Sequence, residues 1–529
     1  MSQQQYPYNQ VPQMGQPMMP PAPMPRRKAT WQERLLKGNT SRPLTFRQER
    51  TLPSWVIGSS VAVFFVAFAV CTFVWGYPME LRDAIIASLS VLLFFYGARV
   101  VTNGAVREKD KVFIRNVFIV GLAARLLWII YCYFFFNPEY WGNTFGDGAD
   151  TTWYMPFGEE IAQWVRDGFP VPFGELMTKW HATIDDVGYP IWLAIVNILT
   201  FGESDVFMPF LVKCIVGAYC AVCIYHVAKR HFGDGTARIA ALFVALNPNM
   251  IYWCGNLFKE VEMVFLCCLC VDLVDKTFSS GSKLTFKSLY PGIFAGFALF
   301  FFRAALGMVV FLAMGAHIVM ASGRVMSAGK KIIAGVLVAL TLLVGMGDQL
   351  RKQTQFMIDT AQSDQQVKNM EWRSTRKDSG GRTQSFAKYA GKAVFAPLIF
   401  TIPFPTFNAA DAGQVLQMQL SGGSYIKNIF SFFVIWVMFI MLISGEWRKH
   451  VFILAYTVGY LVTLVLSQFA QSGRFHMPIW PMLMLFAAHG IQLAKTNPRI
   501  RKWFPVALAV EVIACLAWNW FKLKGRGMI

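Results

Sequence analysis

Long apolar runs separated by short polar segments dominate the pattern along the chain. A helix needs about 20 predominantly apolar residues to cross a bilayer, and most of the runs approach that length. Continuous rather than alternating apolar residues predict helices and not barrel strands. We therefore expect an all-α, polytopic integral membrane protein with about thirteen transmembrane helices. The expected spans lie at 54–75, 83–102, 113–136, 207–229, 236–253, 257–275, 289–303, 304–321, 331–347, 426–445, 450–470, 477–494 and 503–521.

Composition supports a membrane protein and adds a strong positive charge. The 529 residues are 55% hydrophobic and 15% charged, whereas a soluble protein would carry roughly a quarter charged residues. The net charge of +19 fits cytoplasmic loops rich in Lys and Arg. No nucleic-acid-binding motif accompanies this charge, so we expect no nucleic-acid partner.

The distribution of the positive charges predicts an orientation. A Gln/Pro/Met-rich tail and a basic segment fill residues 1–53, directly before the first span. The basic segment indicates a cytoplasmic N-terminus, and Arg107, Lys109 and Lys111 place the second connection on the same side. The third span then emerges on the extracytoplasmic side. The membrane would be a bacterial inner membrane or a plasma membrane.

The alternation of the spans between the two sides of the membrane divides the chain into six regions. Two signals disagree about the side of the membrane on which residues 348–392 lie. The segment carries more Lys and Arg than Asp and Glu, which favours the cytoplasmic side, although the alternation of the spans places it outside. It would lie inside if 331–347 does not cross and 393–407 does. The regions are 1–53, the tail and basic segment; 54–136, the first spans; 137–206, an extracytoplasmic loop with interfacial helices; 207–347, a transmembrane core; 348–425, a polar segment with a Pro-broken hairpin; and 426–529, the last spans.

The first large loop holds the most polar stretch of the chain, NTFGDGADTTWY at 143–154. Asp147 and Asp150 lie there between glycines and aromatic residues, and the loop as a whole is acidic. The apolar run that follows, 189–201, is too short to span and is expected to lie in the outer interface. Asp in a Gly-rich turn often bonds its own backbone, so a catalytic and a purely structural role both stay open here.

Four separate segments bring charges to the same predicted face. Besides the first loop, these are Lys259–Glu260, Arg303, and Arg474 with His476. Charged residues near the membrane are functional candidates, although snorkelling to the interface would also explain single ones. A carboxylate can deprotonate a hydroxyl or hold a divalent metal, while Lys and Arg stabilise a phosphate leaving group. Together they indicate transfer from an anionic lipid carrier.

Several motifs resemble the polytopic GT-C glycosyltransferases, and in particular the family 39-like protein mannosyltransferases and lipid A aminoarabinose transferases. The resemblance rests on four stretches, about a third of the chain. Two departures are that the loop acids lie three residues apart rather than adjacent, and that Lys259–Glu260 stands where Thr-Glu is usual. The stretches are GDGADTTWYMPFGEEIAQWVRDG, GYPIWLAIVNILTFGESD, AKRHFGDGTARIAALFVALNP and GRFHMPIWPMLMLFAAHGI.

The resemblance implies a GT-C-like fold and a glycosyltransferase that moves a hexose or pentose from a polyprenyl-phosphate donor to a lipid, glycan or protein. The family's loop acid corresponds to Asp150, with Asp147 second. Lys259, Arg303 and Arg474 would bind the donor phosphate, supported by Glu260, Tyr154 and His476. Whether Asp147 and Asp150 hold a divalent metal such as Mg²⁺ or Mn²⁺ stays open. The other partners expected are membrane lipids.

Two further functions stay open at this point. An O-antigen polymerase or ligase would rely on arginines, and the basic segment 348–392 favours it. A lipid-oligosaccharide flippase or transporter would show repeats, broken helices and charges at mid-bilayer, and the chain has no clear repeat.

Overall fold

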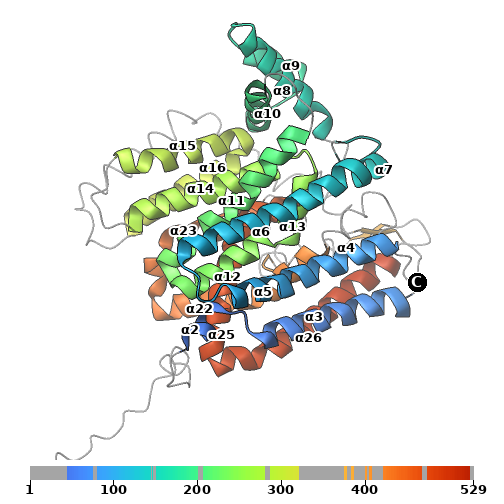
Figure 1. Ribbon diagram of the computed structural model, residues 1–529, viewed down its shortest axis with the longest axis vertical. Coiled ribbons are helices and arrows are strands. Elements are labelled where there is room, and N and C mark those ends of the chain that lie inside the picture. The colour runs from blue at the N-terminus through green and yellow to red at the C-terminus, as the bar shows by residue number, and fades with distance from the viewer. Residues whose placement is uncertain are drawn as a thin grey trace, which may run out of the picture.

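A computed structural model of the protein is helical through most of the described chain (Figure 1). Seven helical runs among the described residues are long and apolar enough to cross a membrane: Phe46–Val74, Leu81–Gly104, Asp110–Trp141, Phe207–Phe232, Ser421–Ser444, Gly473–Thr496 and Pro498–Phe521. The structure describes residues 44–75, 80–144, 146, 150–200, 207–279, 286–320, 375–377, 383–385, 399–401, 404–407, 421–466 and 473–524.

The elements of the N-terminal half include three π-helical turns that continue α-helices. In chain order they are α2 (Phe46–Arg50), α3 (Ser54–Ala69), η1 (Val70–Val74), α4 (Leu81–Leu92), η2 (Leu93–Gly97), α5 (Ala98–Gly104), α6 (Asp110–Tyr131), η3 (Cys132–Phe136), α7 (Asn137–Trp141), α8 (Thr151–Arg166), α9 (Phe173–Lys179), α10 (Gly188–Leu199), α11 (Phe207–Phe232), α12 (Asp234–Ala245), α13 (Pro248–Tyr252) and η4 (Trp253–Gly255).

The C-terminal half continues with helices and one short strand pair. Its elements are α14 (Glu260–Ser279), α15 (Phe286–Phe302), α16 (Ala304–Met320), β1 (Thr375–Lys377), β2 (Thr383–Ser385), α22 (Ser421–Ser444), η6 (Glu446–Lys449), α23 (Val451–Leu466), α24 (Gly473–His476), η7 (Met477–Ile479), α25 (Trp480–Thr496) and α26 (Pro498–Lys524).

The expected all-α architecture holds for the described residues apart from the strand pair. β1 and β2 are antiparallel, with Arg376 opposite Gln384, in the polar segment where no apolar run favours a helix. The side of the membrane on which this segment lies stays a prediction. The expected span at 331–347 lies outside the described residues, so the count of about thirteen spans also stays a prediction.

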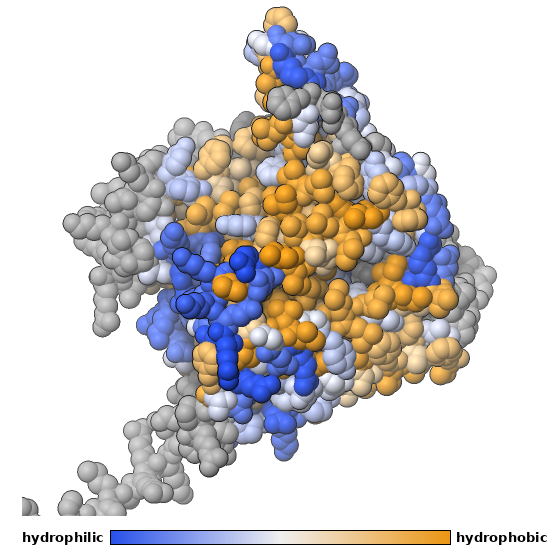
Figure 2. Space-filling view, viewed as in Figure 1, coloured by the Kyte–Doolittle hydropathy of each residue, from blue (hydrophilic) through white to orange (hydrophobic). Residues whose placement is uncertain are grey.

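The surface of the bundle is apolar where a soluble protein would be polar. Figure 2 shows hydrophobic residues across the middle of the molecule, with hydrophilic residues gathered at the lower left and on the projecting part at the top. Large apolar side chains such as Val100, Leu127, Leu312, Leu442 and Ile513 are exposed on five different helices. A surface of this extent is not stable in water, so the apolar helices indicate an integral membrane protein.

The predicted span at 236–253 is wrong as a single helix. α12 ends at Ala245, and the chain restarts in α13 after Asn247, whose side chain accepts from Asn249 N at 3.1 Å. The reason is local, because Pro248 has no N–H and disfavours helix in the residue before it. The buried Arg125 of α6 donates to the carbonyl of Ala245 at 2.8 Å. This bond gives a carbonyl at the end of α12 a partner within the bundle.

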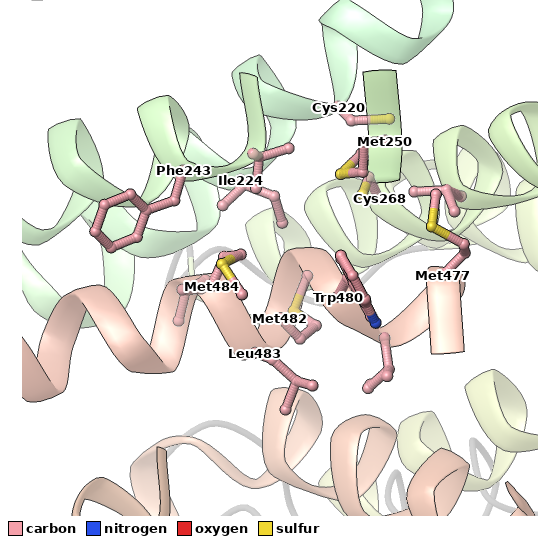
Figure 3. Packing of buried hydrophobic residues seen from close by; sticks show 14 of the residues in the cluster. Cys220, Ile224, Phe243, Met250, Cys268, Met477, Trp480, Met482, Leu483 and Met484 are labelled. Carbon is pink, nitrogen blue, oxygen red and sulfur yellow. The ribbon is translucent and has the colours of Figure 1, made fainter. Parts of the chain in front are cut away.

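The core is packed around α25, which contacts α22 and α12. Figure 3 shows Trp480 and Met484 of α25 facing side chains of the neighbouring helices, among them Ile224 of α11 and Cys268 of α14. All ten cysteines are buried and none forms a disulfide. They act as small packing residues within the helices.

Three helices form an arm that projects from one end of the bundle (Figure 1, teal). The arm comprises α8, α9 and α10, with its own apolar core that includes Phe157 and Leu176. Gly158 lets α8 approach α10, since a Cβ there would lie 2.9 Å from the Leu193 Cβ. α10 has 12 residues, which agrees with the predicted helix that is too short to span. The apolar pattern did not predict the bounds of α8 and α9.

The opposite end of the bundle carries a network of ion pairs. Arg50 binds Asp234 at 2.7 Å, and Arg230 binds Asp272 at 2.7 Å and Asp275 at 2.6 Å. These contacts join α2, α12, α11 and α14, and we call this the basic end. The connections predicted to be cytoplasmic at residues 226–238 and near Arg50 therefore meet at one end, away from the arm.

Candidate functional site

The first loop is fixed to the bundle by asparagine side chains. Asn137 donates to the carbonyls of Thr144 at 3.1 Å and Gly255 at 2.9 Å, so it ties the loop to η4. Gly146 has φ +103 and donates its N–H to the Asn143 side chain at 3.0 Å. A Cβ on Gly146 would overlap the Asn256 side chain. Glycine is required here by both backbone conformation and space.

Replacing Gly146 with Ala is expected to lower the midpoint of thermal unfolding in detergent, because the loop must move off Asn256 and adopt a strained φ. The matched control is Gly142→Ala, since Gly142 also has positive φ, +66, but a Cβ there meets open space. Backbone strain alone costs about 1–2 kcal/mol, and overlap adds about 1–3 kcal/mol. Equal stability losses in the two variants would show that the loop does not dock on Asn256.

Arg474 is the centre of a charged cluster at the arm end of the bundle. Its guanidinium binds the Asp150 carboxylate at 2.7 Å and also pairs with Glu260. It lies over the Phe258 ring, 4.2 Å from the centroid. Residues separated by more than 200 positions in the sequence therefore form one ion-pair network.

The two carboxylates on Arg474 differ in their access to solvent. The Asp150 side chain is 39% exposed, whereas Glu260 is 1% exposed. Asp150 precedes α8 as its N-cap residue, yet its side chain makes no capping hydrogen bond. The Asp150 carboxylate therefore does not cap the helix that it precedes. Its carboxylate instead points to Arg474 and remains accessible.

Lys259 and Arg303 lie beside this pair. Lys259 forms an ion pair with Asp186, which precedes α10 in the arm. Arg303 lies between α15 and α16 and stacks over the Phe475 ring, 4.3 Å from the centroid. All of the predicted phosphate-binding residues therefore contact either an arm residue or the segment 473–476.

A second layer of buried polar groups lies behind the cluster. Tyr154 is buried and packs edge-on against Tyr189 at 5.0 Å. Burial raises the pKa of Tyr154 well above its usual range, and Asp150 and Glu260 raise it further. Tyr154 therefore stays a protonated phenol and is not a base. The Lys213 ammonium lies 3.6 Å from the Glu262 carboxylate and donates to the Asn256 carbonyl at 2.8 Å.

Several of these residues were not identified from the sequence as site residues. Lys213 is a charge within the apolar run PFLVKCIVG, and this isolation is the signal that would have found it. Asp186, Glu262, Phe258 and Phe475 give no such signal. Of the predicted residues, His476 is fully buried in α24, and Asp147 lies outside the described residues.

A metal role finds no complete set of ligands among the described residues. No group of three or more His, Cys, Asp or Glu side chains there has the arrangement to hold a metal ion. The nearest carboxylates, Asp150 and Glu260, both bind Arg474, and a cation would have to compete with that guanidinium. Asp147, the second predicted ligand, lies outside the described residues, so a metal held by Asp147 and Asp150 stays a prediction.

Sequence comparison shows no family for this chain. No protein-family model matches it, and no curated protein is significantly similar to it. The resemblance to GT-C glycosyltransferases therefore rests on the motifs quoted above.

Proposed function

We propose that the protein is an integral-membrane glycosyltransferase that takes a sugar from a polyprenyl-phosphate donor and passes it to a lipid, glycan or protein hydroxyl. The observation that carries this proposal is the position of Arg474, which contacts an accessible and a buried carboxylate, Asp150 and Glu260, next to Lys259 and Arg303. Three cations gathered at one site favour a phosphate ligand that exchanges with their carboxylate partners. The accessible carboxylate beside it supplies a base.

The proposed reaction uses these groups in one displacement. Asp150 accepts the proton of the acceptor hydroxyl, whose oxygen forms a bond to the anomeric carbon of the sugar. The bond between that carbon and the phosphate oxygen breaks, and the electron pair leaves with the polyprenyl phosphate. Arg474, Lys259 and Arg303 stabilise the charge that develops on this leaving group. Phosphate binding to Arg474 also frees Asp150 from its ion pair.

The proposal includes an orientation and a location. The basic end would face the cytoplasm, because cytoplasmic connections are enriched in Lys and Arg. The arm and Arg474 would then lie on the extracytoplasmic side of a bacterial inner membrane or a plasma membrane. About thirteen spans would connect the two sides.

Purified protein reconstituted in liposomes is expected to consume a labelled polyprenyl-phosphate sugar and release free polyprenyl phosphate when a membrane extract supplies acceptors. The charged cluster does not indicate which sugar the donor carries, so the assay uses a panel of hexose and pentose donors. Thin-layer separation of the labelled lipid measures consumption. Failure to consume any donor in the panel would contradict the proposed function.

A second candidate function, a lipid-oligosaccharide flippase or transporter, is favoured by two other observations. The interruption between α12 and α13 is a broken helix with a buried arginine, Arg125, at the break. Lys427 and Glu511 are buried within α22 and α26, both long enough to span. Such features accompany transport pathways. A flippase would move the labelled lipid to the other leaflet with its sugar–phosphate bond intact.

The remaining alternative, an O-antigen polymerase or ligase, rested on the basic segment 348–392. That segment lies outside the described residues except for β1 and β2, and none of the contacts above favours this function.

A further inference from the structure

The ion pair between Lys259 and Asp186 joins a buried group to an accessible one. The Lys259 side chain is 4% exposed, whereas Asp186 is 37% exposed. Glu260 also attracts the Lys259 ammonium, whereas Arg303 and Arg474 repel it. A buried ammonium requires an anionic or hydrogen-bonding partner, since leaving it unpaired is costly. Asp186 can return to water at much lower cost, so of the two members of the pair it is the exchangeable one.

The attachment of Asp186 to its own segment fits such an exchange. The Thr183 hydroxyl donates to one Asp186 carboxylate oxygen at 3.2 Å, while the other oxygen pairs with Lys259. Asp186 therefore has a partner that it keeps when it leaves Lys259. Glu260 behaves differently, because at 1% exposure it cannot be released from Arg474 into water. The pair of Arg474 with Glu260 is thus permanent, whereas the pair of Lys259 with Asp186 is exchangeable.

We propose that Asp186 occupies the anion subsite of Lys259 as an internal substitute for phosphate, and that a membrane-borne phosphate ester binds by displacing it. Asp186 is then a specificity-determining residue. A ligand must carry an anion strong enough to replace a carboxylate, which excludes neutral lipids. The identity of the ester as a sugar donor rests on the proposed function, but displacement itself does not require transfer.

The exchange also couples binding to the arm. Asp186 and Asp150 are both arm residues or border it, and each pairs with a cation outside the arm. A phosphate that takes over Lys259 and Arg474 therefore releases two contacts between the arm and the remaining bundle. Gly188 remains as a packing contact, because a Cβ there would lie 2.7 Å from the Phe301 carbonyl. The arm is thus loosened at its charged side and stays attached at its apolar side.

Binding of decaprenyl phosphate to the purified full-length protein in nanodiscs, followed by tryptophan fluorescence, tests this proposal. Asp186→Asn is expected to bind decaprenyl phosphate about fivefold more tightly than wild type. This factor corresponds to the free energy that a partly exposed ion pair contributes. Asp167→Asn is the matched control, since it removes the same charge from an exposed arm position. The control should bind like wild type. Asp186→Asn combined with Lys259→Gln should lose the gain, because the subsite itself is then absent.

Three outcomes would overturn the proposal: affinity of Asp186→Asn equal to wild type, a gain of the same size in Asp167→Asn, or a gain that survives Lys259→Gln. Asp186→Ser provides a second variant if Asp186→Asn does not fold, because it also removes the carboxylate; a similar gain is expected, and no gain would contradict the proposal. Inorganic phosphate is titrated in parallel to distinguish free phosphate from a membrane-borne ester as the ligand. If Asp186→Asn gained the same affinity for both ligands, the site would be a free-phosphate site, which contradicts the proposal. Tighter lipid binding without any transfer would retain this inference and reject the proposed function.

Discussion

Replacing Arg474 with Met is expected to lower the free energy of unfolding by about 3–5 kcal/mol, the usual cost of breaking a buried ion pair on one side. The reason is Glu260, which is 1% exposed and pairs with Arg474. Without the guanidinium its carboxylate would remain buried and unpaired. Transfer should fall by about 100- to 1,000-fold as well, since a group that stabilises developing charge is lost.

Thermal unfolding in detergent and donor consumption measure the two effects of Arg474→Met. Arg448→Met is the matched control, because Arg448 is exposed at η6 in the opposite part of the bundle and should change stability by less than about 0.5 kcal/mol. Adding Glu260→Gln to Arg474→Met should recover most of the stability but not the transfer. If the double variant were as unstable as the single one, the pairing with Glu260 would not explain the loss.

Asp150→Asn is expected to reduce transfer by about 100- to 10,000-fold, the usual contribution of a general base, with little change in stability. The Asp150–Arg474 pair is 39% and 22% exposed on its two sides, and pairs of this kind contribute about 1 kcal/mol or less. The loss should appear in kcat, because the amide keeps the shape of the side chain but accepts no proton.

The control for Asp150→Asn is again Asp167→Asn, which should retain the rate of wild type. The rate is measured at donor concentrations up to saturation with a fixed amount of acceptor extract. These rates give kcat and the KM for the donor separately. Wild-type kcat in Asp150→Asn would remove this residue from its proposed role as base.

The positions of most apolar helices could be predicted from sequence because a bilayer imposes one length and one kind of surface on each span. α3, α6, α11 and α26 illustrate this, each overlapping an apolar run of the expected length. The interruption after α12 was missed for a physical reason. Hydropathy averages over a window, and Asn247-Pro248 lies in a run whose other residues are apolar. The dipeptide itself signals the helix start.

For the candidate site, alternation of the spans predicted which segments share a face, and the structure does bring Asp150, Glu260 and Arg474 into contact. It could not predict the pairing within that face. That Arg474 holds two carboxylates, and that Lys259 is paired with Asp186, depends on tertiary packing of the arm. Asp186 is one of several acids in the loop, and its sequence neighbours do not distinguish it.

The most direct measurement is a structure of the full-length protein in a lipid bilayer with a non-transferable polyprenyl-phosphate sugar analogue. The account predicts the phosphate within hydrogen-bonding distance of Arg474 and Lys259, and the anomeric carbon facing Asp150. Asp186 should have left Lys259. A phosphate bound elsewhere, for example between α22 and α26 near Lys427, with Arg474 still paired to Asp150, would contradict the account.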